Sequence, residues 1–335
     1  MRKYVKTIGV SLAAMLLLAG CGNNESAGGS SGGSGENEQK TYKVGISQFA
    51  PHPSLDAATE GFKKALEEKG IKVEFAEQNA QGDQPNAQVI AQNFAGDKVD
   101  LIFANATPSA IAALNVTKEI PILFTSVTDP VGAGLVKAFD QPGENITGTT
   151  DNHPDATKKT IDFITKEVGA KKIGIVYNSG EQNSVVQVDA VEELAKANGA
   201  SIVEVSVSTT AEVKQAAESL VGRVDALYIP TDNTVVSALE SVISVANDKK
   251  IPLFVGELDS MKKGAVAASG FSYYDLGYET GLMAVEILTG KKKPSDIHVA
   301  LPQSLALMIN KKAAEAQGLT VKDEWKNIGE FYEGE

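Results

Sequence analysis

The chain has 335 residues, of which 42% are hydrophobic, and a formal net charge of −12. This length accommodates two domains of common size with substantial cores. A chain with 43 acidic and 31 basic side chains is a poor match for nucleic acid or for anionic lipid, so we predict no nucleic-acid partner. We attribute the excess of acidic residues to solubility.

The N-terminus has the pattern of an export signal. A basic start precedes an apolar run over 8–18, which is too short to span a membrane comfortably. The run ends in Leu-Ala-Gly-Cys, which resembles the signal of bacterial lipoproteins, in which the cysteine is lipidated and becomes the first residue. We therefore predict a signal peptide over 1–20, palmitate-type lipidation at Cys21, and an extracytoplasmic protein anchored to the cell membrane. An ordinary signal peptide with an incidental cysteine is the alternative.

Cys21 is the single cysteine, which excludes a disulfide framework and a thiolate metal site within one chain. Residues 21–40 are rich in Gly, Ser and Asn and contain almost no apolar side chains. This composition is typical of a flexible tether. The folded part of the chain is then expected to begin near residue 41.

One stretch of the folded part occurs twice. Residues 99–127 read VDLIFANATPSAIAALNVTKEIPILFTSV, and residues 224–257 read VDALYIPTDNTVVSALESVISVANDKKIPLFVGE. Each copy predicts a buried strand, a sharp turn, a helix and a second buried strand. Thr107 and Asp232 are the predicted N-caps of the two helices. A helix N-terminus directly after a parallel strand presents free backbone N–H groups and the positive end of the helix dipole.

Around the two copies, strands alternate with long helices, which is typical of parallel sheets with right-handed crossovers. We expect strands at 41–49, 71–78, 101–104, 121–127, 145–151, 171–179, 201–208, 226–229, 252–255, 265–272 and 297–301. The fold class is therefore α/β, with two similar doubly wound parallel-sheet lobes joined by crossover strands. Counting elements places 41–150 and 274–302 in the N-terminal lobe, and 151–273 and 303–335 in the C-terminal lobe.

Ligands of open parallel sheets bind beyond the carboxyl ends of the strands, so we take the candidate site from those ends. The first lobe contributes hydroxyl groups and helix N-termini, which suit a carboxylate. The second lobe contributes carboxylates, which suit an ammonium group. The predicted ligand-binding residues are Ser47, Gln48, Phe49, His52, Thr107, Ser109, Thr125, Ser126, Asp129, Tyr177, Glu181, Asn183, Ser184, Asp232, Asn233, Glu257 and Tyr273.

A ligand that carries a carboxylate and an ammonium group on one carbon is an α-amino acid, and the aromatic candidates suit a flat side chain. Several candidates have a structural alternative. Asp232 and Thr107 suit helix capping, Asp129 before Pro130 suits a turn, and His52 suits an exposed loop. Glu181 is more informative, because it lies in a polar loop where packing requires no acid.

The export signal, the tether and the duplicated lobes resemble the solute-binding lipoproteins of bacterial ABC importers. The segments KVGISQFAPHPSLDAATEGFKKAL, ATPSA, PILFTSVTDPVGAGLV, YNSGEQNS, PTDNTV and FSYYDLG are similar to the family that includes tryptophan- and tyrosine-uptake binding proteins. The resemblance implies a type I periplasmic-binding-protein fold, with lobes that close on the ligand and deliver it to a membrane permease. We expect a monomer without a cofactor or a metal that captures an amino acid, with Trp, Tyr and Phe as first candidates.

Other functions fit the sequence less well or stay open. An enzyme is disfavoured, because the folded part has no Gly-x-Gly-x-x-Gly after the first strand, no Walker loop, no Gly-x-Ser-x-Gly elbow and no histidine spacing for a metal. A sugar pocket is disfavoured, because Arg223 is the one arginine beyond the signal. A nucleoside or a branched-chain amino acid on the same fold remains open, as does ligand sensing without transport.

Overall fold

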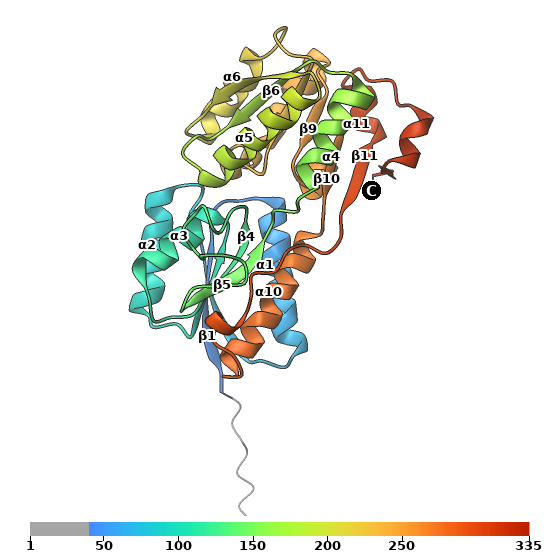
Figure 1. Ribbon diagram of the computed structural model, residues 1–335. Coiled ribbons are helices and arrows are strands. Elements are labelled where there is room, and N and C mark those ends of the chain that lie inside the picture. The colour runs from blue at the N-terminus through green and yellow to red at the C-terminus, as the bar shows by residue number, and fades with distance from the viewer. Residues whose placement is uncertain (1–39, 335) are drawn as a thin grey trace, which may run out of the picture. The chain divides into compact units, whose positions relative to one another are not determined.

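The computed structural model describes residues 40–334. The predicted signal peptide, the lipidation site and nearly all of the predicted tether lie outside these residues. Within them, the chain forms two sheets, each covered by helices on both faces (Figure 1). No helix in the described part of the chain is both long enough and apolar enough to cross a membrane.

The first sheet is entirely parallel and has the strand order β2-β1-β3-β4-β5. We call this sheet and its helices lobe one. One of these helices, α10, comes from late in the chain and packs on α1, β4 and β5. The bounds are β1 Tyr42–Gln48, α1 Pro53–Glu68, β2 Val73–Asn79, α2 Gln84–Gly96, β3 Leu101–Asn105, α3 Thr107–Val116, β4 Ile122–Val127, β5 Ile146–Thr150 and α10 Tyr273–Leu288.

The second sheet has the order β12-β11-β10-β9-β8-β6-β7 and is parallel except for the antiparallel pair β10–β11. We call this sheet and its helices lobe two. The bounds are α4 Ala156–Asp162, a π-helix Phe163–Val168, β6 Lys172–Tyr177, α5 Gln182–Ala197, β7 Ser201–Ser206, a 3-10 helix Thr210–Glu212, α6 Val213–Ser219, β8 Ala226–Ile229, α7 Asn233–Ser237, α8 Leu239–Lys249, β9 Leu253–Val255, α9 Leu258–Lys262, β10 Ala267–Gly270, β11 Ala306–Asn310, α11 Lys311–Ala316, a 3-10 helix Asp323–Asn327 and β12 Glu330–Tyr332. A further 3-10 helix, Pro294–Asp296, lies against β5 of lobe one.

The central strands are apolar along their whole length because both faces are covered. In β3, Ile102 belongs to the core that α2 and α3 complete, and Phe103 belongs to the core that α1 and α10 complete. Successive side chains of a strand point to opposite faces, so a strand between two helical layers needs an uninterrupted apolar run. This explains why the short runs in the two copies were recognisable as strands.

The predicted duplication is confirmed by the topology. The order β2-β1-β3-β4-β5 in lobe one recurs as β7-β6-β8-β9-β10 in lobe two. Asp100 accepts a hydrogen bond from the backbone N–H of Lys43, and its counterpart Asp225 accepts hydrogen bonds from Lys171 and Lys172. An equivalent aspartate in each lobe therefore links the start of the first strand to the start of the third strand.

Three sequence-based expectations were wrong. Residues 297–301 form no strand and reach β5 through a single bridge, between Thr149 and Ala300. Pro302 follows this bridge and has no backbone N–H to extend a ladder. The strands β11 and β12, which we did not predict, widen the second sheet. The single helix expected in the second copy is broken at Ala238 into α7 and α8.

Glycines allow α1 and α10 to pack with their backbones in close contact. A Cβ on Gly61 would lie 2.0 Å from the carbonyl oxygen of Tyr274, and one on Gly277 would lie 1.8 Å from that of Ala58. Neither position could hold a side chain without moving a backbone. The contact fixes α10, which follows the last strand of the repeated pattern in lobe two, onto the first helix of lobe one.

We predict that Gly277→Ala lowers the free energy of unfolding by about 1–3 kcal/mol, because the added methyl group overlaps a backbone carbonyl. Gly96→Ala is the matched control, since a Cβ on this helical glycine meets nothing within 4 Å. It should leave stability unchanged or raise it by up to about 1 kcal/mol. Urea unfolding of both variants tests the difference, and equal midpoints would contradict the packing argument.

Candidate functional site

Two strands of lobe one end in backbone conformations that side-chain-bearing residues rarely adopt. Ala106, after β3, has φ 84°, and Ser126, near the end of β4, has φ 54°. Positive φ at a residue other than glycine costs free energy and is concentrated at binding and active sites. The hydrogen bond from the Ala106 N–H to the Thr125 carbonyl joins the two strand ends. This edge of the sheet is therefore held in a strained but well-defined shape.

The helix that follows this edge begins without a side-chain cap. The N-cap of α3 is Ala106, which has no polar atom to offer, so the prediction of Thr107 as N-cap was wrong by one residue. The hydroxyl groups of Thr107 and Ser126 are both buried without a hydrogen-bond partner. Ser109, on the first turn, accepts no backbone N–H as a cap, and its hydroxyl instead accepts from that of Ser47 at 3.3 Å. Free donors and a helix dipole therefore meet at one strand edge, which favours an anionic group.

The acidic residues predicted in lobe two hold the start of α7. Glu181 is 1% exposed, and its two oxygens accept from the backbone N–H groups of Asn233 and Thr234 and from their side chains. Asp232 caps the helix by accepting from the Val235 N–H, as predicted, and also accepts from the Asn178 N–H. The hydrogen-bonding capacity of both carboxylates is thus largely used within lobe two, so their contact with a ligand stays a prediction.

Asp151, which sequence reasoning missed, lies where the chain leaves lobe one. It directly follows the last residue of β5, and its Oδ2 accepts from the Tyr273 hydroxyl at 2.9 Å. Its Oδ1 is buried and unpartnered. The sequence signal available for Asp151 was its position alone. It is an acidic residue directly after a buried strand, at the point where the chain crosses between the lobes.

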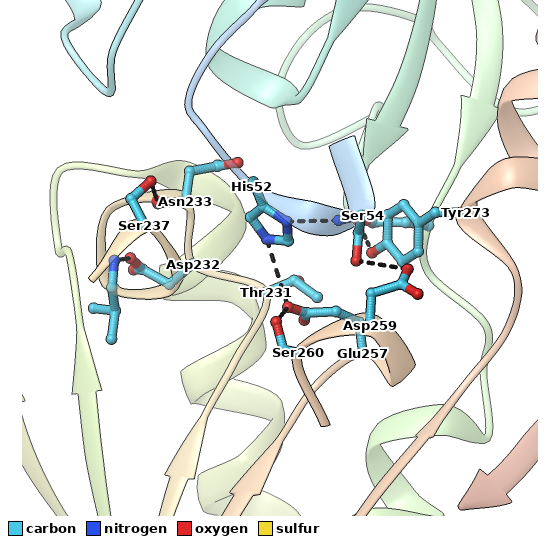
Figure 2. Close-up of polar contacts among 12 residues, drawn as sticks. His52, Ser54, Thr231, Asp232, Asn233, Ser237, Glu257, Asp259, Ser260 and Tyr273 are labelled. Atoms are coloured by element: carbon cyan, nitrogen blue, oxygen red, sulfur yellow. Dashed lines mark hydrogen bonds and ion pairs between the residues drawn. The ribbon is translucent and has the colours of Figure 1, made fainter. Parts of the chain in front are cut away.

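His52 and Glu257 join the two lobes. His52 is the N-cap of α1 and accepts at Nδ1 from the Ser54 N–H, while its Nε2 lies 3.5 Å from Glu257 Oε1 (Figure 2). Because Nδ1 is an acceptor, the ring is neutral and carries its proton on Nε2, where it faces Glu257. Burial lowers the pKa of His52 to about 3 and raises that of Glu257 to about 8. The expectation that His52 is an exposed loop residue is excluded, because it is 4% exposed.

Further contacts cross between the lobes around this pair. Ser54 donates to Asp259 at 3.2 Å, and Ser237 donates to the carbonyl of Pro51 at 2.9 Å. At the opposite rim, Gln182 donates to Asp129 at 3.4 Å. Asp129 also accepts from the Gly132 N–H, so it serves the turn and the lobe contact together. The lobes therefore meet through short polar contacts at several points.

Two small cavities lie between the lobes and share Thr128, Asp151, Thr231 and Tyr273. They leave about 10 Å³ and about 30 Å³ to the centre of a water molecule, enough for one or two waters. We call the smaller one the inner cavity. Its lining is completed by His52, Leu55, Ser126, Asn183 and Asn233.

The buried carboxyl groups around these cavities have no cation from the protein. Among the residues that the structure describes, no Lys or Arg forms an ion pair with Asp151, Glu181, Asp232 or Glu257. Burial, and next to it the charge of Glu181, raises the pKa of Asp232 to about 7. Burial also raises the pKa of Asp151. A positively charged group placed here would find several acceptors and no competing cation.

Of the predicted site residues, five line the inner cavity: His52, Ser126, Asn183, Asn233 and Tyr273. The others lie in its supporting structure or elsewhere. Gln48 bonds to Asp56 and Thr59, Phe49 is in the core of lobe one, and Thr125 pairs with Thr149. Ser184 is buried beside Asn183, and Tyr177 donates its hydroxyl to Glu204. Besides Asp151, the predicted set lacks Leu55 and Thr128, which carry no distinctive pattern, and Thr231, which does stand at the carboxyl end of β8.

Residues 43–328 match the model of a family described as ABC transporter substrate binding protein. The chain belongs to this family. A curated relative, the tyrosine-binding protein of Clostridioides difficile (strain R20291), is 45% identical over 322 residues, which cover 94% of this chain and 92% of the relative. As a family member, the protein is an extracytoplasmic binding component that works with a small-molecule ligand and an ABC permease.

Two solved structures of the family differ in how well they superpose. An ABC domain from Streptococcus pneumonia in complex with L-Trp is 31% identical, with a TM-score of 0.82, over 87% of this chain and 99% of that one. The ligand-free, open structure of an adhesive substrate binding protein from Clostridium difficile is 44% identical, with a TM-score of 0.63, over 88% and 100%. The more similar sequence superposes less well, and it is the one described as ligand-free and open.

The described residues offer no obvious metal site, since no three His, Cys, Asp or Glu side chains between positions 40 and 334 gather closely enough to bind an ion. The site is instead a set of fixed hydrogen-bond donors on lobe one and acceptors near the chain crossing and on lobe two. Such an arrangement of donors and acceptors suits a small polar molecule.

We predict that stability of the ligand-free protein falls as the pH rises from 6.5 to 8. In this window the folded state keeps the proton on Glu257, whose pKa is about 8, whereas the unfolded chain has released it. The unfolded chain therefore binds fewer protons, and the free energy of unfolding declines with pH. His52, with a folded pKa of about 3, opposes this trend only below its unfolded pKa near 6.5.

Glu257→Gln should flatten this decline by up to about 1.4 kcal/mol per pH unit, the effect of one proton. Urea unfolding at four pH values measures the slope, with the exposed Glu192→Gln as control. A slope that is unchanged in Glu257→Gln would show that this carboxyl group is ionised in the folded protein.

Proposed function

We propose that this protein is the lipid-anchored binding component of an ABC importer, and that it captures an aromatic α-amino acid, with tyrosine as the first candidate, between its two lobes. The observation that carries the proposal is that the interlobe site contains two kinds of buried polar group without a partner. Buried acceptors without a cation lie near Asp151, and buried donors without an acceptor lie at the start of α3 and at Ser126. A zwitterion supplies both missing charges.

In this proposal the carboxylate of the ligand binds at the strained edge of lobe one. The N-terminus of α3 lacks a side-chain cap, and the hydroxyl groups of Thr107 and Ser126 lack partners. An anion there gains charge-assisted hydrogen bonds and the favourable end of the helix dipole. It also satisfies buried polar atoms that otherwise cost free energy.

The ammonium group of the ligand binds Asp151. This carboxyl group is oriented through Oδ2 by the Tyr273 hydroxyl, which leaves Oδ1 for the ligand. Asn183, whose Oδ1 is also unpartnered, lines the same cavity. Glu181 and Asp232, which we predicted as direct partners, contribute mainly by fixing α7 and by adding negative potential. Because the ammonium favours ionised carboxylates, binding at neutral pH is expected to release protons.

Aromatic side chains at the crossing between the lobes suit a flat ligand. Phe271 and Tyr273 stack with ring centroids 5.2 Å apart, and both line the larger of the two interlobe cavities. The names of relatives point in the same direction, since one is a tyrosine-binding protein and another was solved with L-Trp. These similarities support an aromatic amino acid as the ligand.

The small size of the cavities supports a hinge mechanism. An amino acid is far larger than the one or two waters that fit between the lobes, so the lobes must separate to admit it. Closing around the ligand then makes contacts from both lobes. A ligand that raises the closed form from 1% to 99% must bind it more tightly by about 5.5 kcal/mol. In the proposal, the protein acts as a monomer without a cofactor and without catalysis, and the chain crossings near 150, 273 and 303 form the hinge.

A thermal-shift screen of the full-length chain against the twenty amino acids, common nucleosides and sugars tests the ligand class. We expect a shift confined to the aromatic amino acids, because a ligand at one hundred times its dissociation constant adds about 2.7 kcal/mol. A shift with nucleosides alone would contradict the assignment of the carboxylate and ammonium positions.

Asp151→Asn should weaken binding of tyrosine by at least one hundredfold in titration calorimetry, because it removes the charge opposite the ammonium group. Its melting temperature should change little, since the amide still accepts from Tyr273. Asp155→Asn is the matched control, because Asp155 is exposed just before α4 and lines neither interlobe cavity. Equal affinities of Asp151→Asn and the unmodified protein would overturn the assignment.

Lipid anchoring is tested separately at Cys21, which lies outside the described residues. Cys21→Ser removes the thiol that lipidation requires, so the protein should move from the membrane fraction to the soluble extracytoplasmic fraction. Labelling with radioactive palmitate should be lost in parallel. Retention of both in Cys21→Ser would show that the N-terminus is anchored in another way.

A further inference from the structure

A groove separate from the two interlobe cavities runs along α3. Its lining residues on this helix stand at positions 107, 108, 111, 112 and 115, which share one side of the helix over two turns. Gln84 and Gln88 of α2 form a second wall, and Gly180 and Gln182 of lobe two form the third. The groove leaves about 270 Å³ to the centre of a water molecule, far more than the inner cavity.

The chemistry of the groove matches that of a peptide. Its floor is apolar, and its lining includes four carboxamide side chains and no charged side chain: Gln84, Gln88, Asn115 and Gln182. A carboxamide has donors and an acceptor, as a peptide group does, so the two pair readily. The amide of Gln84 already donates to the backbone carbonyl of Gly180 at 2.9 Å. Oε1 of Gln182 is buried and unpartnered.

The groove begins where the proposed ligand carboxylate lies. Its first residue on α3, Thr107, is 1% exposed and has an unpartnered hydroxyl group. The preceding residue, Ala106, is hydrogen-bonded to Thr125, next to Ser126 of the inner cavity. A ligand that continues beyond its carboxyl carbon can therefore follow α3 into the groove.

We infer that the groove extends the binding site to short peptides whose N-terminal residue is aromatic. This inference rests on the proposed function, because the first residue of the peptide takes the place of the amino acid. The free ammonium group stays at Asp151, the first peptide group replaces the carboxylate at the start of α3, and the second residue lies along Pro108 and Ile111. Extension at the ammonium end meets much less space, because the cavity beyond Asp151 and Tyr273 leaves only about 30 Å³ to the centre of a water molecule.

Titration calorimetry of the full-length chain with L-tyrosine, L-tyrosyl-glycine and glycyl-L-tyrosine tests the inference. We expect tyrosyl-glycine to bind within tenfold of tyrosine, and glycyl-tyrosine to bind at least one hundredfold more weakly. Ile111→Trp fills the groove and should weaken tyrosyl-glycine at least tenfold while leaving tyrosine unchanged. Ile328→Trp, at an exposed isoleucine of lobe two outside the groove, should change neither.

Ile111 also contacts the core of lobe one, so weaker binding by Ile111→Trp could result from misfolding. A second variant separates the two causes. Gln88→Leu keeps the size of the side chain and removes its amide, and it should weaken tyrosyl-glycine alone. Binding of tyrosine without tyrosyl-glycine would overturn the inference and leave the proposed function intact. Binding of tyrosyl-glycine without tyrosine would overturn the proposed function and keep the groove. Absence of both would overturn both.

Discussion

The buried carboxyl groups between the lobes are the constraint on which the rest of the site depends. Removing a carboxylate from water is costly unless a cation or several donors replace the water. Glu181 and Asp232 meet this requirement with backbone N–H groups of α7 and of the loop before α5. Glu257 keeps its proton but has no partner for Oε2, and Asp151 has none for Oδ1. The protein thus holds two incompletely satisfied acids at the place where its two lobes meet.

The two lobes treat helix N-termini in opposite ways, although they descend from the same pattern. In lobe two the helix after the third strand is capped by Asp232 and reinforced by Glu181. In lobe one the corresponding helix is preceded by Ala106 and has no side-chain cap. At a capped helix N-terminus a side chain already accepts from the backbone N–H groups. At an uncapped one these N–H groups stay available to a ligand. The duplication therefore gives the molecule one structural copy and one copy suited to ligand contact.

Much of the fold could be predicted because its signals are local. The runs LIFA and ALYI indicated strands covered on both faces, and the offset between the copies indicated two lobes. The strands β11 and β12 were missed because they are short and stand outside the repeated pattern of strands and helices. The site was harder to predict because its contacts come from several separate segments. Strand ends identified His52, Ser126 and Asn183, but whether a carboxylate is free or occupied depends on N–H groups that approach from other segments, as Glu181 shows.

The close contact between α1 and α10 has a consequence for the order in which the molecule is assembled. Tyr278 and Glu68, which bridge these helices at 2.8 Å, are 210 residues apart in the sequence. Lobe one therefore lacks one of the two helices that cover this face of its sheet until most of lobe two has been synthesised, and the glycine-lined side of α1 has no helix to pack against before then. Contacts between distant residues form slowly, because a long loop must close first. For an extracytoplasmic protein such a delay is an advantage, because a lobe that is not yet fully packed is easier to move across a membrane.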